Sequence, residues 1–176
     1  MSVIRQTGSR TIADVGFTRL DEVTIEAPDG STAIRFVLRL ANAVAVVPLD
    51  GDDVILIEQY RTPIGESLLE IPAGLLDAPG EEPIAAASRE LEEEIGFLPH
   101  SLSHLFDLIT SPGVVDEVIS IYVADGLEAV SRKPEGIEER HAAVHRMPLS
   151  EALDLVRQGR IRDGKSVVGL LLASQR

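Results

Sequence analysis

The segment from Pro83 to Gly96 restricts the fold more than any other, because its composition and spacing predict a helix with defined ends. Proline is favoured in the first turn of a helix, and here it precedes Ile84 and three alanines, which have the highest helix propensity. Leu91 and Ile95 lie four residues apart and so share one helix face. Gly96 supplies a stop. We therefore expect a helix over residues 83–95.

Two β-hairpins are expected before this helix. The first joins residues 23–25 to residues 33–40 through Ala27-Pro28-Asp29-Gly30, in which Asp-Gly supplies the positive φ angles of a tight turn. The second joins residues 44–49 to residues 54–57 through Asp50-Gly51-Asp52-Asp53. The apolar composition of the second pair predicts buried strands.

The remainder of the chain alternates between strands and helices. Strands are expected at residues 119–123 and 142–145, a helix at about 150–158 with Ser150 as its cap, and a last helix from near Lys165. The fold class is therefore α/β (α+β). A chain of 176 residues buries one substantial core. We expect an N-terminal β-region over residues 1–40 and a larger α/β domain over residues 41–176, because a polar hairpin region gives way to Ala- and Val-rich strands near residue 40.

Charge and cysteine content exclude several classes of function. The net charge is −13, whereas neutralising a nucleic-acid backbone requires clustered Lys and Arg, so we expect no nucleic-acid partner. No run of about 18 apolar residues is present and the first residues, MSVIRQTGSR, lack the apolar stretch of a secretory signal, so we expect neither a membrane partner nor export. The absence of cysteine fits a cytoplasmic protein.

Three glutamates of the expected helix point to a metal. Glu90, Glu93 and Glu94 stand at i, i+3 and i+4 and so project from one face, where like charges destabilise an isolated helix by roughly a few tenths of a kcal/mol per pair. A divalent cation would relieve this repulsion, and ligation by oxygen alone selects Mg²⁺ or Mn²⁺, which also bind phosphate oxygens. The alternative is an ordinary solvated acidic face.

The segment from residue 74 to residue 97 resembles the Nudix box, G-x5-E-x7-R-E-U-x-E-E-x-G-U, in which U is aliphatic or aromatic. The matching residues are Gly74, Glu81, Arg89, Glu90, Leu91, Glu93, Glu94, Gly96 and Phe97. The one departure is an extra residue between Gly74 and Glu81, where six residues replace five. The resemblance implies a Nudix-type α/β/α sandwich with a mixed sheet and a Mg²⁺-dependent diphosphate hydrolase.

The resemblance also implies the metal ligands. Glu90 and Glu94 would bind Mg²⁺, or Mn²⁺ as a substitute, together with the backbone carbonyl of Ala73. Glu93 would be a further ligand or the catalytic group that orients the attacking water.

Supporting roles are implied for Gly74, Glu81 and Arg89. Arg89 would pair with Glu81 and hold the loop against the helix, as groups behind metal ligands commonly do. An ordinary i,i+4 pair between Arg89 and Glu93 is the alternative.

Three further segments resemble the ADP-ribose pyrophosphatase branch of the Nudix family. They are Ser-Pro-Gly-Val-Val-Asp-Glu at 111–117, Glu-Gln-Tyr-Arg at 58–61 and Leu-Glu-Ile-Pro-Ala-Gly at 69–74. This likeness implies a nucleoside diphosphate substrate, cleavage of ADP-ribose to AMP and ribose 5-phosphate, and a homodimer that exchanges its N-terminal β-region.

By the same likeness, guanidinium groups would contact the diphosphate or the terminal ribose, and an aromatic ring would stack on the adenine. The residues assigned to substrate binding are Arg61, Arg35, Arg39, Phe17, Glu70 and Pro112. For each arginine the alternative is a solubilising surface group, and for Phe17 it is core packing.

The branch supplies a further carboxylate from a mobile loop, which here is residues 134–141. Glu138 or Glu139 is therefore the expected catalytic base, since a loop can close to bring a base to the attacking water. Arg140 and His141 interrupt the acidic run that is usual at this place.

Other functions remain open on the sequence alone. One alternative is hydrolysis of GDP-mannose or of a dinucleotide by the same chemistry. Alternatives from other classes are a non-catalytic sensor that binds ADP-ribose and an acidic interaction domain without a ligand.

Overall fold

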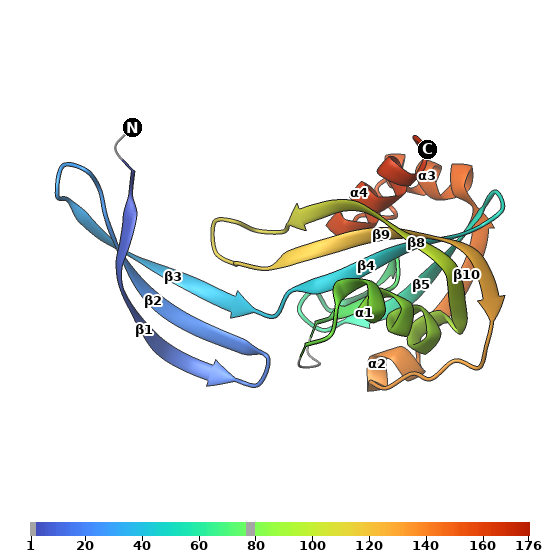
Figure 1. The fold of residues 1–176 in the computed structure, drawn as a ribbon, viewed down its shortest axis with the longest axis horizontal. Helices are drawn as coiled ribbons and strands as arrows, with labels where there is room; N and C mark the ends of the chain where they lie inside the picture. The colour runs from blue at the N-terminus through green and yellow to red at the C-terminus, as the bar shows by residue number, and fades with distance from the viewer. Residues whose placement is uncertain (1–2, 77–79) are drawn as a thin grey trace. The chain divides into compact units, whose positions relative to one another are not determined.

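The computed structural model describes residues 3–76 and 80–176. These residues form two compact units (Figure 1). The first reaches to Asn42 and includes Ile109–Val118, and the second comprises Ala43–Leu108 and Ile119–Arg176. Among the described helices, none is long and apolar enough to cross a membrane.

The first unit is a three-stranded antiparallel sheet of β1 (Arg5–Val15), β2 (Thr18–Glu26) and β3 (Thr32–Leu40). The β2–β3 pair is the first expected hairpin, and Gly30 takes a φ of 82° in its turn. Strand β1 was not expected, because it is almost wholly exposed and shows no alternation of apolar residues. Residues 109–118 join this unit through a hydrogen bond from Leu38 N to Val114 O at 2.8 Å.

The second unit contains a mixed sheet. Its strands are β4 (Ala43–Asp50), β5 (Asp53–Arg61), β6 (Glu66–Glu70), β7 (Ala73–Leu75), β8 (Phe97–Ile109), β9 (Val118–Ala129) and β10 (Ala143–Pro148). The order is β10-β5-β4-β9-β8, with β6 paired to β5 and β7 to β4. Strand β4 runs parallel to β9 and antiparallel to β5 and β7.

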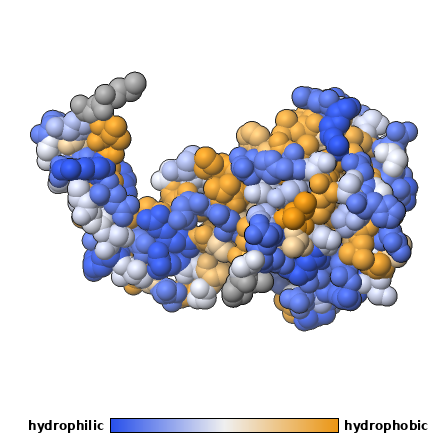
Figure 2. Space-filling view, viewed as in Figure 1, coloured by the Kyte–Doolittle hydropathy of each residue, from blue (hydrophilic) through white to orange (hydrophobic). Residues whose placement is uncertain are grey.

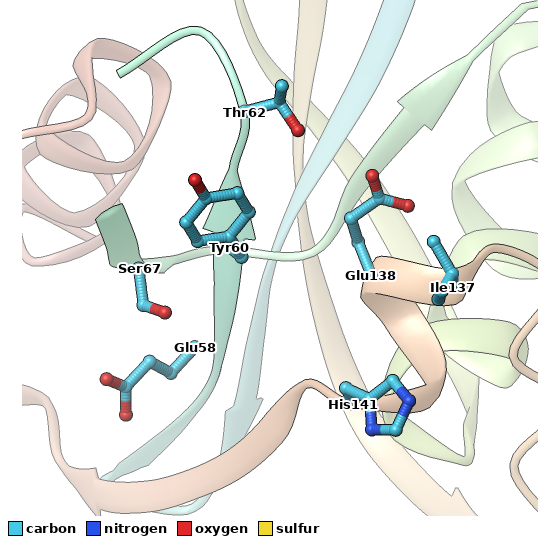
Figure 3. Close-up of a pocket in the computed structure, with 7 residues that line it drawn as sticks. All are labelled: Glu58, Tyr60, Thr62, Ser67, Ile137, Glu138 and His141. Carbon is cyan, nitrogen blue, oxygen red and sulfur yellow. The ribbon is translucent and has the colours of Figure 1, made fainter. Parts of the chain in front are cut away.

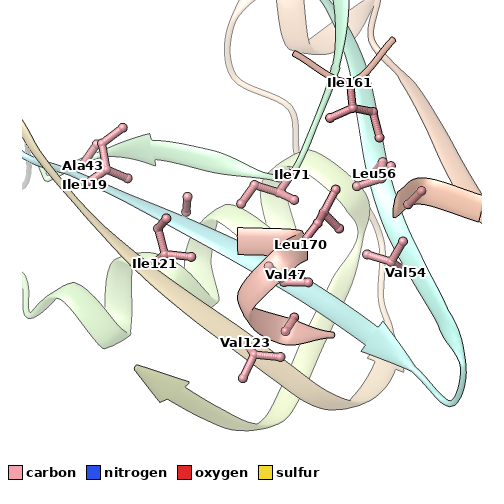
Figure 4. Close-up of a cluster of buried hydrophobic side chains, with 13 residues drawn as sticks. Ala43, Val47, Val54, Leu56, Ile71, Ile119, Ile121, Val123, Ile161 and Leu170 are labelled. Carbon is pink, nitrogen blue, oxygen red and sulfur yellow. The ribbon is translucent and has the colours of Figure 1, made fainter. Parts of the chain in front are cut away.

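Helices cover both faces of this sheet. Helix α1 (Pro83–Glu90) and the π-helical turn η1 (Leu91–Ile95) pack on one face, and α3 (Leu149–Arg157) and α4 (Gly164–Ala173) pack on the other. The larger core lies beneath α3 and α4, where Val47, Ile71 and Leu170 are fully buried (Figure 4). The expected α/β/α sandwich is confirmed.

Two expected helix ends differ in the structure. The helix predicted over residues 83–95 changes to π geometry after Glu90, and Gly96 ends it with a φ of 74°. Helix α3 begins at Leu149 after Pro148, without a side-chain cap from Ser150, so the predicted serine cap is wrong. Helix α4 does have a side-chain cap, because Asp163 accepts a hydrogen bond from Ser166 N at 3.0 Å.

Strand β8 was also not expected. Its partly buried leucines, Leu102, Leu105 and Leu108, recur every third residue rather than every second. Leu102 packs with the core under α1, whereas Leu105 and Leu108 pack with the core under α4. The strand therefore shifts the face that its side chains cover, and the alternation that identifies a strand is lost.

Candidate active site

The glutamates of the Nudix-like segment are held against the backbone of β7. Glu90 and Glu94 are buried, with 6% and 2% of their surface exposed. Glu94 Oε2 accepts a hydrogen bond from Ala73 N at 2.9 Å. A Cβ atom on Gly74 would lie 2.0 Å from Glu90 Oε1, so the carboxylate of Glu90 keeps this position only because residue 74 is glycine. The two carboxylates and residues 73–74 thus form one compact cluster.

The π-helical turn η1 places Glu93 and Glu94, and Glu90 is the last residue of α1 before it. In η1 the Gly96 N–H reaches the carbonyls of both Glu92 and Leu91, which widens the last turn of the helix. Such turns occur often at functional sites. Here Leu91 and Ile95 still reach the core, while Glu94 turns inward to Ala73.

Arg89 connects the loop before α1 to the glutamates. It donates to both carboxylate oxygens of Glu81 at 3.0 and 3.1 Å, to Glu90 Oε1 at 2.7 Å and to Glu93 Oε2 at 2.9 Å. A further contact reaches Leu75 O at 3.4 Å. The two pairs considered for Arg89, with Glu81 and with Glu93, therefore exist together.

Burial raises the pKa values of the three helix glutamates. It raises the pKa of Glu90 to about 7, although the charge of Arg89 opposes the change. It raises the pKa of Glu94 to about 8, although the hydrogen bond from Ala73 opposes it. The pKa of Glu93 is also raised, again chiefly by burial. Carboxylates that resist ionisation in this way are stabilised as anions by a nearby cation.

The donor set fits a hard divalent cation. The groups that the described residues bring together are the carboxylates of Glu90 and Glu94 and the backbone of residues 73–74, and oxygen ligands are the ones that Mg²⁺ and Mn²⁺ prefer. Within residues 3–76 and 80–176, no three His, Cys, Asp or Glu side chains already surround a common point. Arg89 bonds to one carboxylate oxygen of Glu90 and one of Glu93, so the second oxygen of each carboxylate is the one that would bind an ion while the contact with Arg89 is kept.

The two candidate bases lie on α2 (Ile137–Arg140), a short helix inside the expected loop, and they face different surroundings. Glu138 lines a cavity of about 450 Å³ between α2 and the β5–β6 hairpin (Figure 3). Glu139 accepts from Glu135 N at 2.8 Å. Burial is the main cause of the raised pKa values of the helix glutamates, and the charge of Glu139 adds to it at all three.

The cavity beside Glu138 has a lining of mixed polarity that includes the rings of Tyr60 and His141. Its lining residues are Glu58, Tyr60, Thr62, Ser67, Ile137, Glu138 and His141. Apart from Glu138, none of them was a sequence candidate, because these residues come together only when β5 and β6 pair and α2 packs beside them.

Arg61 and Glu70 lie together. Arg61 Nε and Nη2 donate to the two oxygens of Glu70 at 2.8 and 2.6 Å, and 1% of the Glu70 side chain is exposed. Sequence reasoning missed Lys165 and Asp163, which join this pair from α4. The available signal was a lysine two residues after an aspartate at the start of an otherwise apolar helix.

The remaining candidates belong to the first unit. Arg39 donates to Asp21 Oδ2 at 3.2 Å and to Asp116 Oδ2 at 3.1 Å. Arg35 and Pro112 are exposed, and 72% of Phe17 is exposed, so Phe17 is not a core residue of this unit. The extra residue before Glu81 falls within residues 75–80, of which 77–79 lie outside the described residues.

Comparison with known proteins identifies the family. The model of the NUDIX domain matches residues 39–167. An ADP-ribose pyrophosphatase from Mycobacterium tuberculosis (strain ATCC 25618 / H37Rv) is 38% identical over 154 residues, covering 87% of this chain and 73% of that protein. A methanol dehydrogenase activator from Bacillus methanolicus is 38% identical over 147 residues, covering 83% and 79%.

A solved structure agrees with this relationship. The crystal structure of an ADP compounds hydrolase superposes with a TM-score of 0.87 at 29% identity, over 98% of this chain and 92% of that one. The chain therefore belongs to the Nudix family, and it is a Nudix pyrophosphohydrolase.

Proposed function

We propose that this enzyme hydrolyses the diphosphate bond of ADP-ribose to AMP and ribose 5-phosphate with Mg²⁺ as its cofactor. The observation that carries the proposal is the buried pair Glu90 and Glu94 against the backbone of Ala73 and Gly74. The choice of ADP-ribose is supported by residues 58–61, 69–74 and 111–117 and by the name of the mycobacterial relative.

Glu90, Glu94 and the Ala73 carbonyl would hold the Mg²⁺, or Mn²⁺ in its place, with Glu93 as a further ligand or as the group that orients water. The metal supplies neutralisation of the diphosphate and polarisation of its phosphorus–oxygen bonds. Arg89 would orient Glu90 and Glu93 by donating a hydrogen bond to each, and it connects both to Glu81.

Between the two candidate bases, the surroundings favour Glu139 for a role at the metal cluster. Its charge acts on Glu90, Glu93 and Glu94, whereas Glu138 faces the cavity. Glu138 is the alternative catalytic base, and it would reach the attacking water if α2 moves when substrate binds.

The substrate-binding assignments rest on the resemblance to the ADP-ribose pyrophosphatase branch. Arg61, with Arg35 or Arg39, would contact the diphosphate or the terminal ribose, and Phe17 would stack on the adenine. Pro112 would shape the segment beside the substrate. Only 1% of the Glu70 side chain is exposed, which supports a role in which Glu70 positions Arg61 rather than contacting the substrate itself.

We further assign the first unit to a homodimer interface in a cytoplasmic protein. Its sheet exposes large apolar side chains, and Figure 2 shows apolar residues at the surface of this unit among polar ones. They include Ile12, Val15, Phe17, Ile34 and Phe36, which are between 45% and 72% exposed. Exposed apolar side chains of this kind are typical of a surface that a partner covers.

The decisive experiment measures turnover on a panel of ADP-ribose, GDP-mannose and a dinucleotide, with Mg²⁺ and with a chelator. ADP-ribose should give the highest kcat/KM, and the chelator should abolish turnover. Consumption of only GDP-mannose or the dinucleotide would contradict the substrate choice but not the reaction class.

A matched pair of variants separates the enzyme from a non-catalytic sensor. Glu94→Gln should abolish turnover in a folded protein. Glu92→Gln should leave turnover unchanged, because Glu92 pairs with Lys133 at the surface. Binding of ADP-ribose without turnover in the wild type would instead identify a sensor.

A further inference from the structure

Four charged side chains form a continuous chain beside the proposed metal cluster. Arg61 holds Glu70 through two hydrogen bonds, Lys165 Nζ donates to the same carboxylate, and Lys165 also reaches Asp163 Oδ2 at 3.0 Å. These residues come from β5, β6 and the N-terminal end of α4. Two positive and two negative charges therefore balance.

The chain of charges leads from the interior to the surface. The exposed fractions of the side chains are 1% for Glu70, 9% for Lys165, 19% for Asp163 and 38% for Arg61. Buried charges are tolerated only when they are paired, because desolvation is costly. Arg61 is thus the member that a ligand can reach, and the other three lie behind it.

Arg61 also lies within electrostatic reach of the metal cluster. Burial opposes its charge, but Glu70 raises the pKa of Arg61, and the charges of Glu94 and Asp163 add to this effect. A guanidinium in this position suits a diphosphate held by the same cluster.

The N-terminal end of α4 also holds the backbone at residue 71. Ser166 Oγ accepts from Ile71 N at 2.9 Å and donates to Asp163 Oδ2 at 2.6 Å. Residue 71 directly follows Glu70 and precedes the Pro72-Ala73 segment that meets Glu94. Helix α4 therefore anchors the strand end from which the site is built.

We infer that Lys165 is a positioning residue for substrate binding. It holds Glu70 in place and supplies the positive charge that balances Glu70 and Asp163, so that Arg61 remains available to the diphosphate. This inference rests on the proposed diphosphate hydrolase function. Without Lys165 the four-residue group changes from a net charge of zero to −1, which repels an anionic substrate.

The effect should appear in substrate affinity rather than in the chemical step. Lys165→Met keeps the length of the side chain and removes its charge. We expect KM for ADP-ribose to rise about tenfold at nearly constant kcat, the order for one unit charge acting over roughly 10 Å at an effective dielectric constant of about 20.

A double variant distinguishes charge balance from packing. Asp163→Asn retains an oxygen that can cap α4, and combining it with Lys165→Met restores a net charge of zero. The double variant should return KM to within about threefold of wild type, and Lys165→Arg, which keeps the charge, should do the same. Lys133→Met is the control, since Lys133 is 64% exposed and pairs only with Glu92 among the ion pairs of the described residues.

The experiment measures kcat, KM and the melting temperature of all five proteins with Mg²⁺ and ADP-ribose. If Lys165→Met does not fold, the double variant and Lys165→Arg, each compared with wild type, carry the test. A wild-type KM in Lys165→Met, or a double variant no better than the single one, overturns the positioning role alone. A wild type that consumes no compound of the panel overturns the proposed function and this role with it.

Discussion

Gly74→Ala tests the geometry of the cluster most sharply. The new Cβ would lie 2.0 Å from Glu90 Oε1 and 2.1 Å from Glu90 Cδ, where 3.4 Å is the lower limit of ordinary contact. The carboxylate must therefore move by about 1.4 Å, the difference between 3.4 and 2.0 Å. Its contact with Arg89 at 2.7 Å cannot survive unchanged.

The magnitude follows from the burial of Glu90. Forcing an extra carbon into a packed site costs about 1–3 kcal/mol, which lowers the melting temperature of a chain this size by roughly 2–4 °C per kcal/mol. Displacing a catalytic group by about 1 Å costs about a hundredfold in rate. We expect both losses together.

The assay compares Gly74→Ala with Gly164→Ala. Gly164 is the first residue of α4, and its Cβ position has no atom within 4 Å among the described residues, its chain neighbours and its own helix backbone apart. This control should therefore melt at or above the wild-type temperature with unchanged kcat/KM. Melting curves and Mg²⁺-dependent turnover give both quantities. Wild-type stability and activity in Gly74→Ala would refute the placement of Glu90 over residue 74.

Three further changes test other parts of the structure. Arg89→Lys should lower kcat/KM about 10- to 100-fold because one ammonium group cannot replace the contacts that Arg89 makes, and a loss below twofold would contradict its supporting role. Gly169→Ala, measured by chemical denaturation, should destabilise the fold by about 1–3 kcal/mol because its Cβ would lie 3.0 Å from Ile71 Cδ1 and Val47 Cγ2, and an unchanged midpoint would contradict this packing. Burial raises the pKa of Asp163, but Lys165 and Ser166 outweigh it and hold this pKa below its ordinary value of 3.8. The ionised Asp163 therefore stabilises the folded protein above pH 3.8, and this stabilisation is lost as the pH falls through the folded-state pKa. The difference in melting temperature between wild type and Asp163→Asn should therefore shrink from pH 6 towards pH 3, and a constant difference would contradict it.

The sequence predicted those parts of the site that are local along the chain. Pro83 and Gly96 identified the ends of the helical segment, and the spacing of Glu90 and Glu94 identified the carboxylate pair. The π-helical turn was not predictable, because apolar residues four apart suit both kinds of helix. Its register depends on the contact of Glu94 with Ala73, 21 residues earlier.

Long-range ion pairs were not predictable either. Lys165 and Glu70 are 95 residues apart, and no periodicity links them. Strand β8 was missed because its leucines serve two cores in turn. Pro99 lies in that strand, and the structure accommodates it because β8 is at the edge of the sheet.

Anomalous X-ray scattering from bound Mn²⁺ is the most direct test of the claim that the helix glutamates bind the divalent cations used in diphosphate hydrolysis. A crystal soaked in Mn²⁺ should show an anomalous peak bonded to Glu90 and Glu94, next to the contacts of Arg89 with Glu90 and Glu93. The absence of any ion bonded to Glu90 and Glu94 at saturating Mn²⁺ would contradict the account.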